Sequence, residues 1–479
     1  MMRAGSVNKY EIRKTKSQGN PKSEIRNPKW SAISGFSSFV FRASNLFRIS
    51  IFMLRASSCA VLAMVLVFGG GRVYPQQKDF EIRAADVLNV RHVGTQQIQA
   101  LVGRVYMVQP SPSGDIKIWC DSAFRNMQTN LVDLFGHVRI VRDSTTLTST
   151  VGTYSGNDRR AVLPNEIRLD RGRMVLTSKY GEYWANDKHA YFRGNVHVVD
   201  SASSTWSDEL TYFENEDKSI AVGQVRVSST ENNLTVFGDS LVHFEKKKYT
   251  IVPKNPRLMQ IDTSASGGLD TLMIFSSLME AYQDSLQRFV AAGKVEMART
   301  DFAARCGEAT YFYKRDRIIL RQQPVVWHAE NQVSGDSIVI MTRDRKLQSV
   351  YVRGRAMAVS RADSVNKSRF NQLSAREVTL RFRDGKINQI DADRTATSLY
   401  YLFDGATPNG ANRSSGDRIV MEFAAGKIDR LKIVGGVEGR YFPEKMIAKH
   451  EREYNLDGFR WITDQPRRKL LTIVHESYD

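Results

Sequence analysis

The side chains of this sequence that could carry chemistry do not assemble into a familiar catalytic motif. No G-x-S-x-G elbow, P-loop, helix-opening G-x-G-x-x-G or H-E-x-x-H occurs in the 479 residues. The best group of carboxylates for an enzyme acting on polysaccharide is Glu182, Asp208 and Glu209. Such an enzyme would need these carboxylates to converge on one outer face of the fold.

The remaining polar candidates are scattered or recur with the sequence pattern. Asp239, Asp336 and Asp417 follow a glycine at the starts of repeated units, which favours turn-capping residues. The histidines are predicted to be surface or structural residues; they are His92, His137, His189, His197, His243, His328, His450 and His475. The sequence therefore predicts no catalysis, no cofactor and no metal site.

Composition and charge exclude several classes of protein. Hydrophobic residues at 42% and charged residues at 25% exclude wholesale disorder. The net charge of +18 is concentrated in residues 1–77, and the body has no basic stripe of the kind that binds nucleic acid. Three cysteines exclude a disulfide scaffold. Cys120 and Cys306 are expected to lie about 30 Å apart, too far for a disulfide, and to be buried as small hydrophobic side chains.

The N-terminal region contains a secretory signal. Met53 is followed by Arg55, by an apolar run from 59 to 68 and by a glycine-rich break before Arg72. This run is about half of the roughly 20 residues that a membrane span needs. We therefore expect 53–77 to be a signal peptide that exports the chain, and 1–52 to be a disordered, non-native upstream extension.

The body of the chain repeats every 29 residues. Residues 151–169 align without a gap to 180–198, and 210–227 follow at the same offset. Glycine or asparagine recurs at Gly136, Asn165, Gly194 and Gly223, and a tyrosine column runs through Tyr154, Tyr183 and Tyr212. Two and four residues after each glycine or asparagine stand aliphatic columns, which comprise Val138, Ile167, Val196, Val225, and Ile140, Leu169, Val198, Val227.

Each repeat is typical of two strands joined by a polar turn. Apolar and polar residues alternate, and turns such as "ANDK" and "NEDK" divide the halves. The recurring glycine fits a bend that carries a strand from one sheet to the next. We predict an all-β, elongated jelly roll, a taco-like two-sheet array of about ten hairpin units. The expected modules are 78–260 and 261–442, followed by a C-terminal tail at 443–479.

The repeat resembles a known family. The segments "SDELTYFENEDKSIAVGQVRV" and "GEYWANDKHAYFRGNVHVV" are similar to the OstA-like repeat of LptA, a periplasmic lipopolysaccharide-transport protein, and to the N-terminal periplasmic domain of LptD. The resemblance runs from about 100 to 442. No outer-membrane barrel pattern follows residue 441.

This resemblance implies a periplasmic bridge that carries lipopolysaccharide from the inner to the outer membrane and associates with the outer membrane. The implied lipid-binding groove holds the lipid A acyl chains against the two aliphatic columns, with Tyr183 and Tyr212 also in the groove. The implied partners are lipopolysaccharide and other transport components at both membranes, contacted edge to edge through terminal strands. Nucleic acid is not among them.

Two other interpretations remain open. The aliphatic columns are equally typical of an ordinary dry core, which would make the chain a structural or adhesive solenoid. A β-solenoid enzyme acting on polysaccharide through Glu182, Asp208 and Glu209 is the third possibility. Copurification of lipid A would favour the carrier over both.

The first testable prediction concerns the start of the protein. If Met53 is the true start, N-terminal sequencing of the exported protein should find an end near residue 77, and replacing the Met53 codon should abolish production. Production that depends instead on Met1 would show that residues 1–52 belong to the protein.

Overall fold

The structure, a computed structural model, describes residues 80–466 except 111–113, 202, 230–232, 264–268, 284, 300–301, 329, 344–345, 384–385 and 425–426. The expected signal peptide and the upstream extension lie outside the described residues. The all-β prediction is confirmed, because antiparallel strands make up nearly all of the described chain. Among these residues no helix has the length and apolar character needed to cross a membrane.

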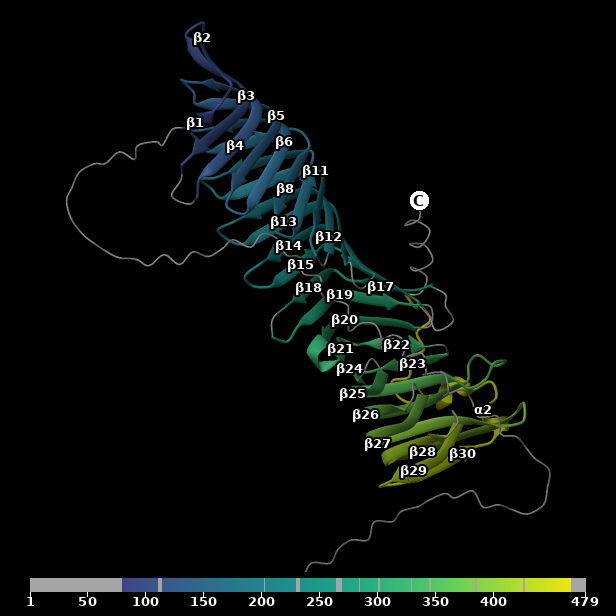
Figure 1. The fold of residues 1–479 in the computed structure, drawn as a ribbon. Helices are drawn as coiled ribbons and strands as arrows, with labels where there is room; N and C mark the ends of the chain where they lie inside the picture. Colours follow the sequence, from purple (N-terminus) through teal and green to yellow (C-terminus); the bar gives the residue numbers. More distant parts are fainter. Residues whose placement is uncertain are drawn as a thin grey trace, which may run out of the picture. The chain divides into compact units, whose positions relative to one another are not determined.

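The described residues form two compact units that divide between Pro256 and Arg257. In the N-terminal unit, strands that follow one another in sequence lie side by side (Figure 1). Its strands are β1 (Glu81–Ala84), β2 (Val87–Val93), β3 (Gln96–Gln109), β4 (Ile116–Asn126), β5 (Leu131–Arg142), β6 (Thr145–Ser155), β7 (Arg160–Leu163), β8 (Ile167–Arg171), β9 (Met174–Ser178), β10 (Tyr180–Trp184), β11 (His189–Val199), β12 (Ser203–Phe213), β13 (Lys218–Ser229), β14 (Leu234–Phe244) and β15 (Tyr249–Pro253).

The C-terminal unit repeats this plan with longer strands near its end. Its elements are β16 (Arg257–Thr263), β17 (Leu269–Phe275), β18 (Leu278–Tyr282), β19 (Arg288–Ala298), β20 (Phe302–Phe312), η3 (Tyr313–Arg315), β21 (Arg317–Arg321), β22 (Val325–His328), β23 (Asn331–Ser334), β24 (Ser337–Arg343), β25 (Lys346–Arg361), β26 (Phe370–Arg383), β27 (Lys386–Asp404), β28 (Thr407–Ala424), β29 (Lys427–Val434), β30 (Glu438–Phe442), α2 (Glu444–Ile447) and η4 (Glu451–Tyr454).

Alternate long strands of the N-terminal unit, namely β3, β5, β11 and β13, are divided into two halves by a bend at the recurring glycine. In the β11–β12 ladder the register shifts between Arg193 and Val196. Gly194 and Asn195 there have φ angles of 80° and 50°, a left-handed conformation that glycine adopts without steric cost. Between β6 and β11 the two halves of a long strand are replaced by separate short strands, β7 to β10. β7 and β10 continue one sheet, called here the first sheet, and β8 and β9 continue the second sheet.

An aspartate on the neighbouring strand faces many of these bends. A Cβ atom on Gly223 would lie 2.2 Å from Oδ2 of Asp208. The same arrangement recurs at Asp86 and Gly103, Asp121 and Gly136, Asp336 and Gly354, and Asp417 and Gly435. Nη2 of Arg355, the residue after the glycine, lies 2.6 Å from Oδ1 of Asp336. Asp336 and Asp417 are therefore bend residues, and the expectation that they cap turns was wrong.

The polar hairpin turns of the first sheet also stack on one another. Residues 185–188, 214–217 and 245–248 form four-residue turns whose last residue has a positive φ angle. The N–H of Glu214 donates to the carbonyl of Lys188 at 2.9 Å, and that of Glu245 donates to Asp217 at 2.8 Å. The row of turns is thus hydrogen-bonded from one repeat to the next. The predicted positions of these turns are confirmed.

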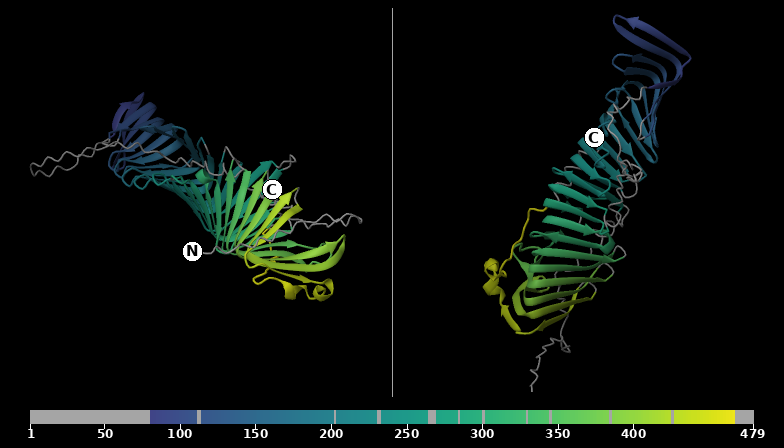
Figure 2. Two further views of the ribbon diagram at one scale, coloured as in Figure 1. Left: turned by 90° about the horizontal axis from the view of Figure 1, so that it is seen from below. Right: turned by 90° about the vertical axis from the view of Figure 1, so that its left-hand side faces the viewer.

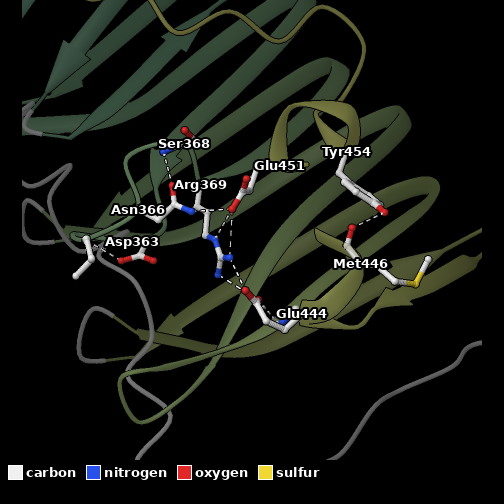
Figure 3. Close-up of polar contacts among 10 residues, drawn as sticks. Asp363, Asn366, Ser368, Arg369, Glu444, Met446, Glu451 and Tyr454 are labelled. Atoms are coloured by element: carbon white, nitrogen blue, oxygen red, sulfur yellow. Dashed lines mark hydrogen bonds and ion pairs between the residues drawn. The ribbon is translucent and has the colours of Figure 1, made fainter. Parts of the chain in front are cut away.

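The chain after β30 packs against the C-terminal unit. Arg369 lies between Glu444 at 2.5 Å and Glu451 at 3.3 Å, and these contacts attach the tail to the start of β26 (Figure 3). Figure 2 shows the short helices of the tail beside the last strands of this unit. Apolar side chains of the tail complete the contact with the sheet; Phe442, Ile447 and Leu456 pack on Met357, Val359, Phe370, Leu399 and Tyr401.

The two described cysteines behave as the sequence indicated. Cys120 and Cys306 are buried and unbridged. Burial raises the pKa of both thiols, to about 11 for Cys120 and about 12 for Cys306, so both stay protonated at neutral pH.

The second prediction tests the bend. Gly223→Ala should lower the free energy of unfolding more than Gly172→Ala, because both glycines have positive φ angles but only Gly223 meets an aspartate. The left-handed conformation alone costs an L-residue about 1 to 2 kcal/mol. Urea denaturation of the two variants measures the difference. Equal losses at the two sites would show that contact with Asp208 does not constrain the bend.

Candidate functional site

The two sheets of each unit enclose an interior between them. In the N-terminal unit, a Cβ atom on Gly181 in β10 would lie 2.8 Å from Cδ1 of Ile167 in β8, although these strands belong to different sheets. In the C-terminal unit, a cavity of about 10 Å³ has Val326 and Val333 on one side and Ile338 and Leu380 on the other. Within each unit, alternate residues of the two sheets therefore face the apolar space between those sheets.

The aliphatic columns predicted from the repeat line the second sheet of the N-terminal unit. At the first inward position after the bend, Val138, Ile167, Val196 and Val225 are 1 to 2% exposed. At the second inward position, Leu169, Val198 and Val227 are buried and Ile140 is half-buried. The residues between them, such as Arg139 and Arg226, contact the outer faces of Trp119 and Trp206. The structure thus brings all eight aliphatic side chains to one wall.

The strands between these columns contribute a second set of inward residues that the sequence analysis missed. Val138 pairs with Ser149, Val196 with Ser207, and Ile140 with Leu147. These inward columns also have the 29-residue period: Ser149, Ser178 and Ser207 follow Cys120, whose burial the sequence predicted, and Leu147, Leu176 and Thr205 follow Ile118. Ser149 donates its hydroxyl to the carbonyl of Val151 at 3.0 Å, so this polar group is satisfied inside an apolar wall.

The tyrosines assigned to the groove lie on the first sheet, near the hairpin turns. Tyr212 is 3% exposed and Tyr183 is half-buried. Nη1 of Arg142 donates to the Tyr183 hydroxyl at 2.7 Å, and this hydroxyl donates to Oε1 of Glu214 at 3.4 Å. Burial, and to a lesser degree the Glu214 carboxylate, raises the pKa of Tyr183 to about 12. Tyr183 is therefore a neutral hydroxyl at physiological pH.

The inward positions of the last strands of the C-terminal unit are smaller and more polar. The first and second inward positions after the bend hold Ala356 and Ala358 in β25, and Ala396 and Ser398 in β27. The large apolar side chains of these strands, such as Met357 and Leu399, instead face the tail. The broad aliphatic wall is consequently lost in the last strands of the C-terminal unit, although Val295 and Met297 still follow the bend in β19.

The carboxylates considered for an enzyme are engaged in structural contacts. Glu182 pairs with Arg160 at 2.5 Å, and Asp208 faces the bend at Gly223. The hydroxyl of Tyr191 is hydrogen-bonded to Glu209, which raises the pKa of that tyrosine after the larger effect of burial. No group of three metal-binding side chains occurs among the described residues.

Histidines of the repeat have structural neighbours. His137 lies 2.8 Å from Asp121 beside a bend, and His197 stacks on Trp206 with ring centroids 4.6 Å apart. The expectation that these two histidines are surface or structural residues is confirmed.

Comparison with known proteins gives matches to two family models. The model described as OstA-like protein matches residues 77–236, and the model described as LptA/(LptD N-terminal domain) LPS transport protein matches residues 176–346. Together they span more than half of the chain. Curated proteins gave no match.

Among solved structures, the chain is similar to LptH, the LptA homologous periplasmic component of the lipopolysaccharide transport device from Pseudomonas aeruginosa. The identity is 11%, the match covers 31% of this chain and 82% of that chain, and the TM-score is 0.16. The two family models, rather than this structural similarity, show the family. Through residues 77–346, the chain belongs to the OstA-like and LptA family of lipopolysaccharide-transport proteins.

Proposed function

We propose that the protein is a periplasmic carrier that holds the acyl chains of lipopolysaccharide in the interior of its N-terminal unit during transfer from the inner to the outer membrane. The observation that carries this proposal is the largely aliphatic wall of the second sheet, from Val138 to Val227, in which only small serines and Thr205 interrupt the aliphatic side chains. Membership of a lipopolysaccharide-transport family supports the same cargo.

The geometry suits an acyl chain for a physical reason. Neighbouring strands lie about 4.8 Å apart, so the successive inward aliphatic side chains form an apolar strip many strands long. An acyl chain along this strip gains about 0.8 kcal/mol for each methylene that leaves water. Transfer of the cargo requires no bond to be made or broken, so the protein needs no catalytic group.

The polar part of the cargo would remain outside this strip. Arg142 and Arg171 end β5 and β8 of the second sheet, and both are half-buried. Lipopolysaccharide carries phosphate groups next to its acyl chains, and guanidinium groups at the rim of an apolar groove suit such an anionic amphiphile. The carrier would therefore shield the apolar part and leave the charged part near water.

The N-terminal end offers a surface for another transport component. All seven residues of β2 are exposed, and Val87, Leu88, Val90 and Val93 are 47 to 64% exposed. An exposed apolar strand at a sheet edge is a template for pairing with a further strand. We therefore place the edge-to-edge contact with another component of the transport machinery at β2.

The third prediction tests the cargo site. A photo-crosslinking residue at Val198 should capture lipopolysaccharide in cells, because Val198 lies in the middle of the aliphatic wall. The same residue at Lys247, in an exposed turn, should not. Immunoblotting for lipid A on the crosslinked protein measures both. Equal labelling at the two positions would contradict the proposed groove.

The fourth prediction separates a lipid groove from a dry core. Val225→Asp should abolish capture at Val198 while the β-sheet signal in circular dichroism persists, because an interior that opens to cargo lets the carboxylate stay hydrated. In a sealed core an unpaired carboxylate would unfold the unit. Ser228→Asp on the outer face of the same strand is the control and should retain capture. Unfolding of Val225→Asp together with absent labelling at Val198 would show that the interior is dry core.

A further inference from the structure

The open side of the N-terminal interior lies opposite the bends. The halves of each long strand are joined through the chain at the bend, where Gly194 and Gly223 have positive φ angles. Away from the bend, the first sheet ends in the turns at 185–188 and 214–217, and the second sheet ends in its own turns at 143–144 and 172–173. No residue of these four turns links one sheet to the other through the chain, so side chains must close this side.

A repeated set of contacts crosses this open side. The Tyr154 hydroxyl of β6 donates to Oε1 of Gln109 at the end of β3. Nη1 of Arg142 at the end of β5 donates to the Tyr183 hydroxyl of β10 at 2.7 Å. In each case the tyrosine lies on the first sheet and its partner lies on the second.

The third tyrosine follows the same offset. Tyr183 lies 41 residues after Arg142, and Tyr212 stands in the same relation to Arg171, whose positive charge acts on the Tyr212 hydroxyl. Arg171 and Tyr212 thus repeat the spacing of Arg142 and Tyr183 one 29-residue repeat later.

Ring contacts extend this series of contacts beside Tyr154, at the N-terminal end of the unit. The ring of Phe80, just before β1, packs edge-on against Tyr154 with centroids 5.1 Å apart. Cζ of Arg125 lies over the ring of Phe80, 5.8 Å from its centroid. Arg125 precedes Tyr154 by the repeat length and so occupies the first position of the tyrosine column.

We propose that the contacts of Gln109 with Tyr154 and of Arg142 with Tyr183, together with Arg171 and Tyr212 at the equivalent positions one repeat later, called here the tyrosine row, hold the two sheets together on their open side and part to admit acyl chains. This inference rests on the proposed function. It changes the role of Tyr183 and Tyr212 from walls of the lipid groove to its closure.

The hydrogen bonds of the tyrosine row can hold the two sheets together and can also be exchanged for hydrogen bonds to water. Burial holds the pKa of Tyr183 and Tyr212 near 12, so both stay neutral. A neutral hydroxyl can accept from Arg142 and donate to Glu214 at the same time. Because Arg142 and Tyr183 are half-buried, water can replace the lost bonds when the sheets separate, and the closure is reversible.

The test measures the rate of cargo loading. Protein purified from the producing cells, with a photo-crosslinker at Val198, is mixed with Kdo2-lipid A and irradiated at increasing times. The Tyr183→Phe protein should load Kdo2-lipid A roughly three- to tenfold faster than the parent protein. This is the factor expected for the loss of a hydrogen bond of ordinary strength. Tyr191→Phe, which removes a hydroxyl from the outer face of β11, is the matched control and should load at the original rate.

A bridged variant tests the opposite direction. Cysteines at Arg142 and Tyr183, in a background with Cys59, Cys120 and Cys306 replaced by alanine, are joined by a bis-maleimide. The bridged protein should lose most of its loading, whereas each single-cysteine variant treated with the same reagent should load faster than the original. Circular dichroism verifies that all variants keep their β structure.

The outcomes distinguish this inference from the proposed function. Original loading rates in both Tyr183→Phe and the bridged protein overturn the closure while leaving the lipid groove intact. Absence of any Kdo2-lipid A labelling at Val198 in the parent protein overturns the groove and the closure with it. Faster loading of Tyr183→Phe together with blocked loading of the bridged protein supports both.

Discussion

The left-handed bends in alternate long strands, such as β11 and β13, are the constraint on which the rest of the structure depends. Two sheets can share one interior only if successive strands bend at the same register position, and a single misplaced bend would turn inward side chains outward. Gly194 and Gly223 supply the conformation, and Asp208 shows how closely the neighbouring strand approaches. Because the bends stack, the residues two and four positions later also stack, and a wall of aliphatic side chains results.

This wall explains why a carrier needs no dedicated pocket of the kind that enzymes have. The interior is built from ordinary core positions such as Val196 and Val225, and it becomes a binding site only if the two sheets can separate. The side that separates must be opposite the bends, where side chains rather than peptide bonds join the sheets. The polar contact between Arg142 and Tyr183 lies on this side, so opening exchanges hydrogen bonds within the protein for bonds to water.

Much of this architecture could be predicted from the sequence, because the 29-residue period places equivalent residues in equivalent environments. The glycine bends, the polar turns and the buried state of Val138 and Cys120 all follow from that period and from alternation along the strands. The inward column of Ser149 and Ser207 has the same period, but a hydroxyl-bearing column is as typical of a solvent-facing side of the sheet. Its burial depends on a hydrogen bond to the local backbone, which polarity alone does not reveal.

Other features could not be read from the sequence because they depend on contacts between sheets. The partner of Tyr183 lies 41 residues away on a strand that is not its neighbour in either ladder. Asp336 and Asp417 lie at bends rather than at turn caps, which the sequence does not distinguish because a glycine–aspartate step is typical of both. The tail contains no sequence repeat from which its position could be predicted. Its contact with Arg369 depends on Glu444 and Glu451, which lie in two different short helices.

The central claim, that the interior is a lipid track and not a dry core, is tested most directly by the lipid content of the protein itself. The protein should be purified without detergent from Gram-negative cells and its extract analysed by mass spectrometry. We predict lipid A in the extract, at an amount that follows the protein and exceeds that of the more abundant membrane phospholipids. An extract without lipid A, or one with phospholipid alone, would contradict the account.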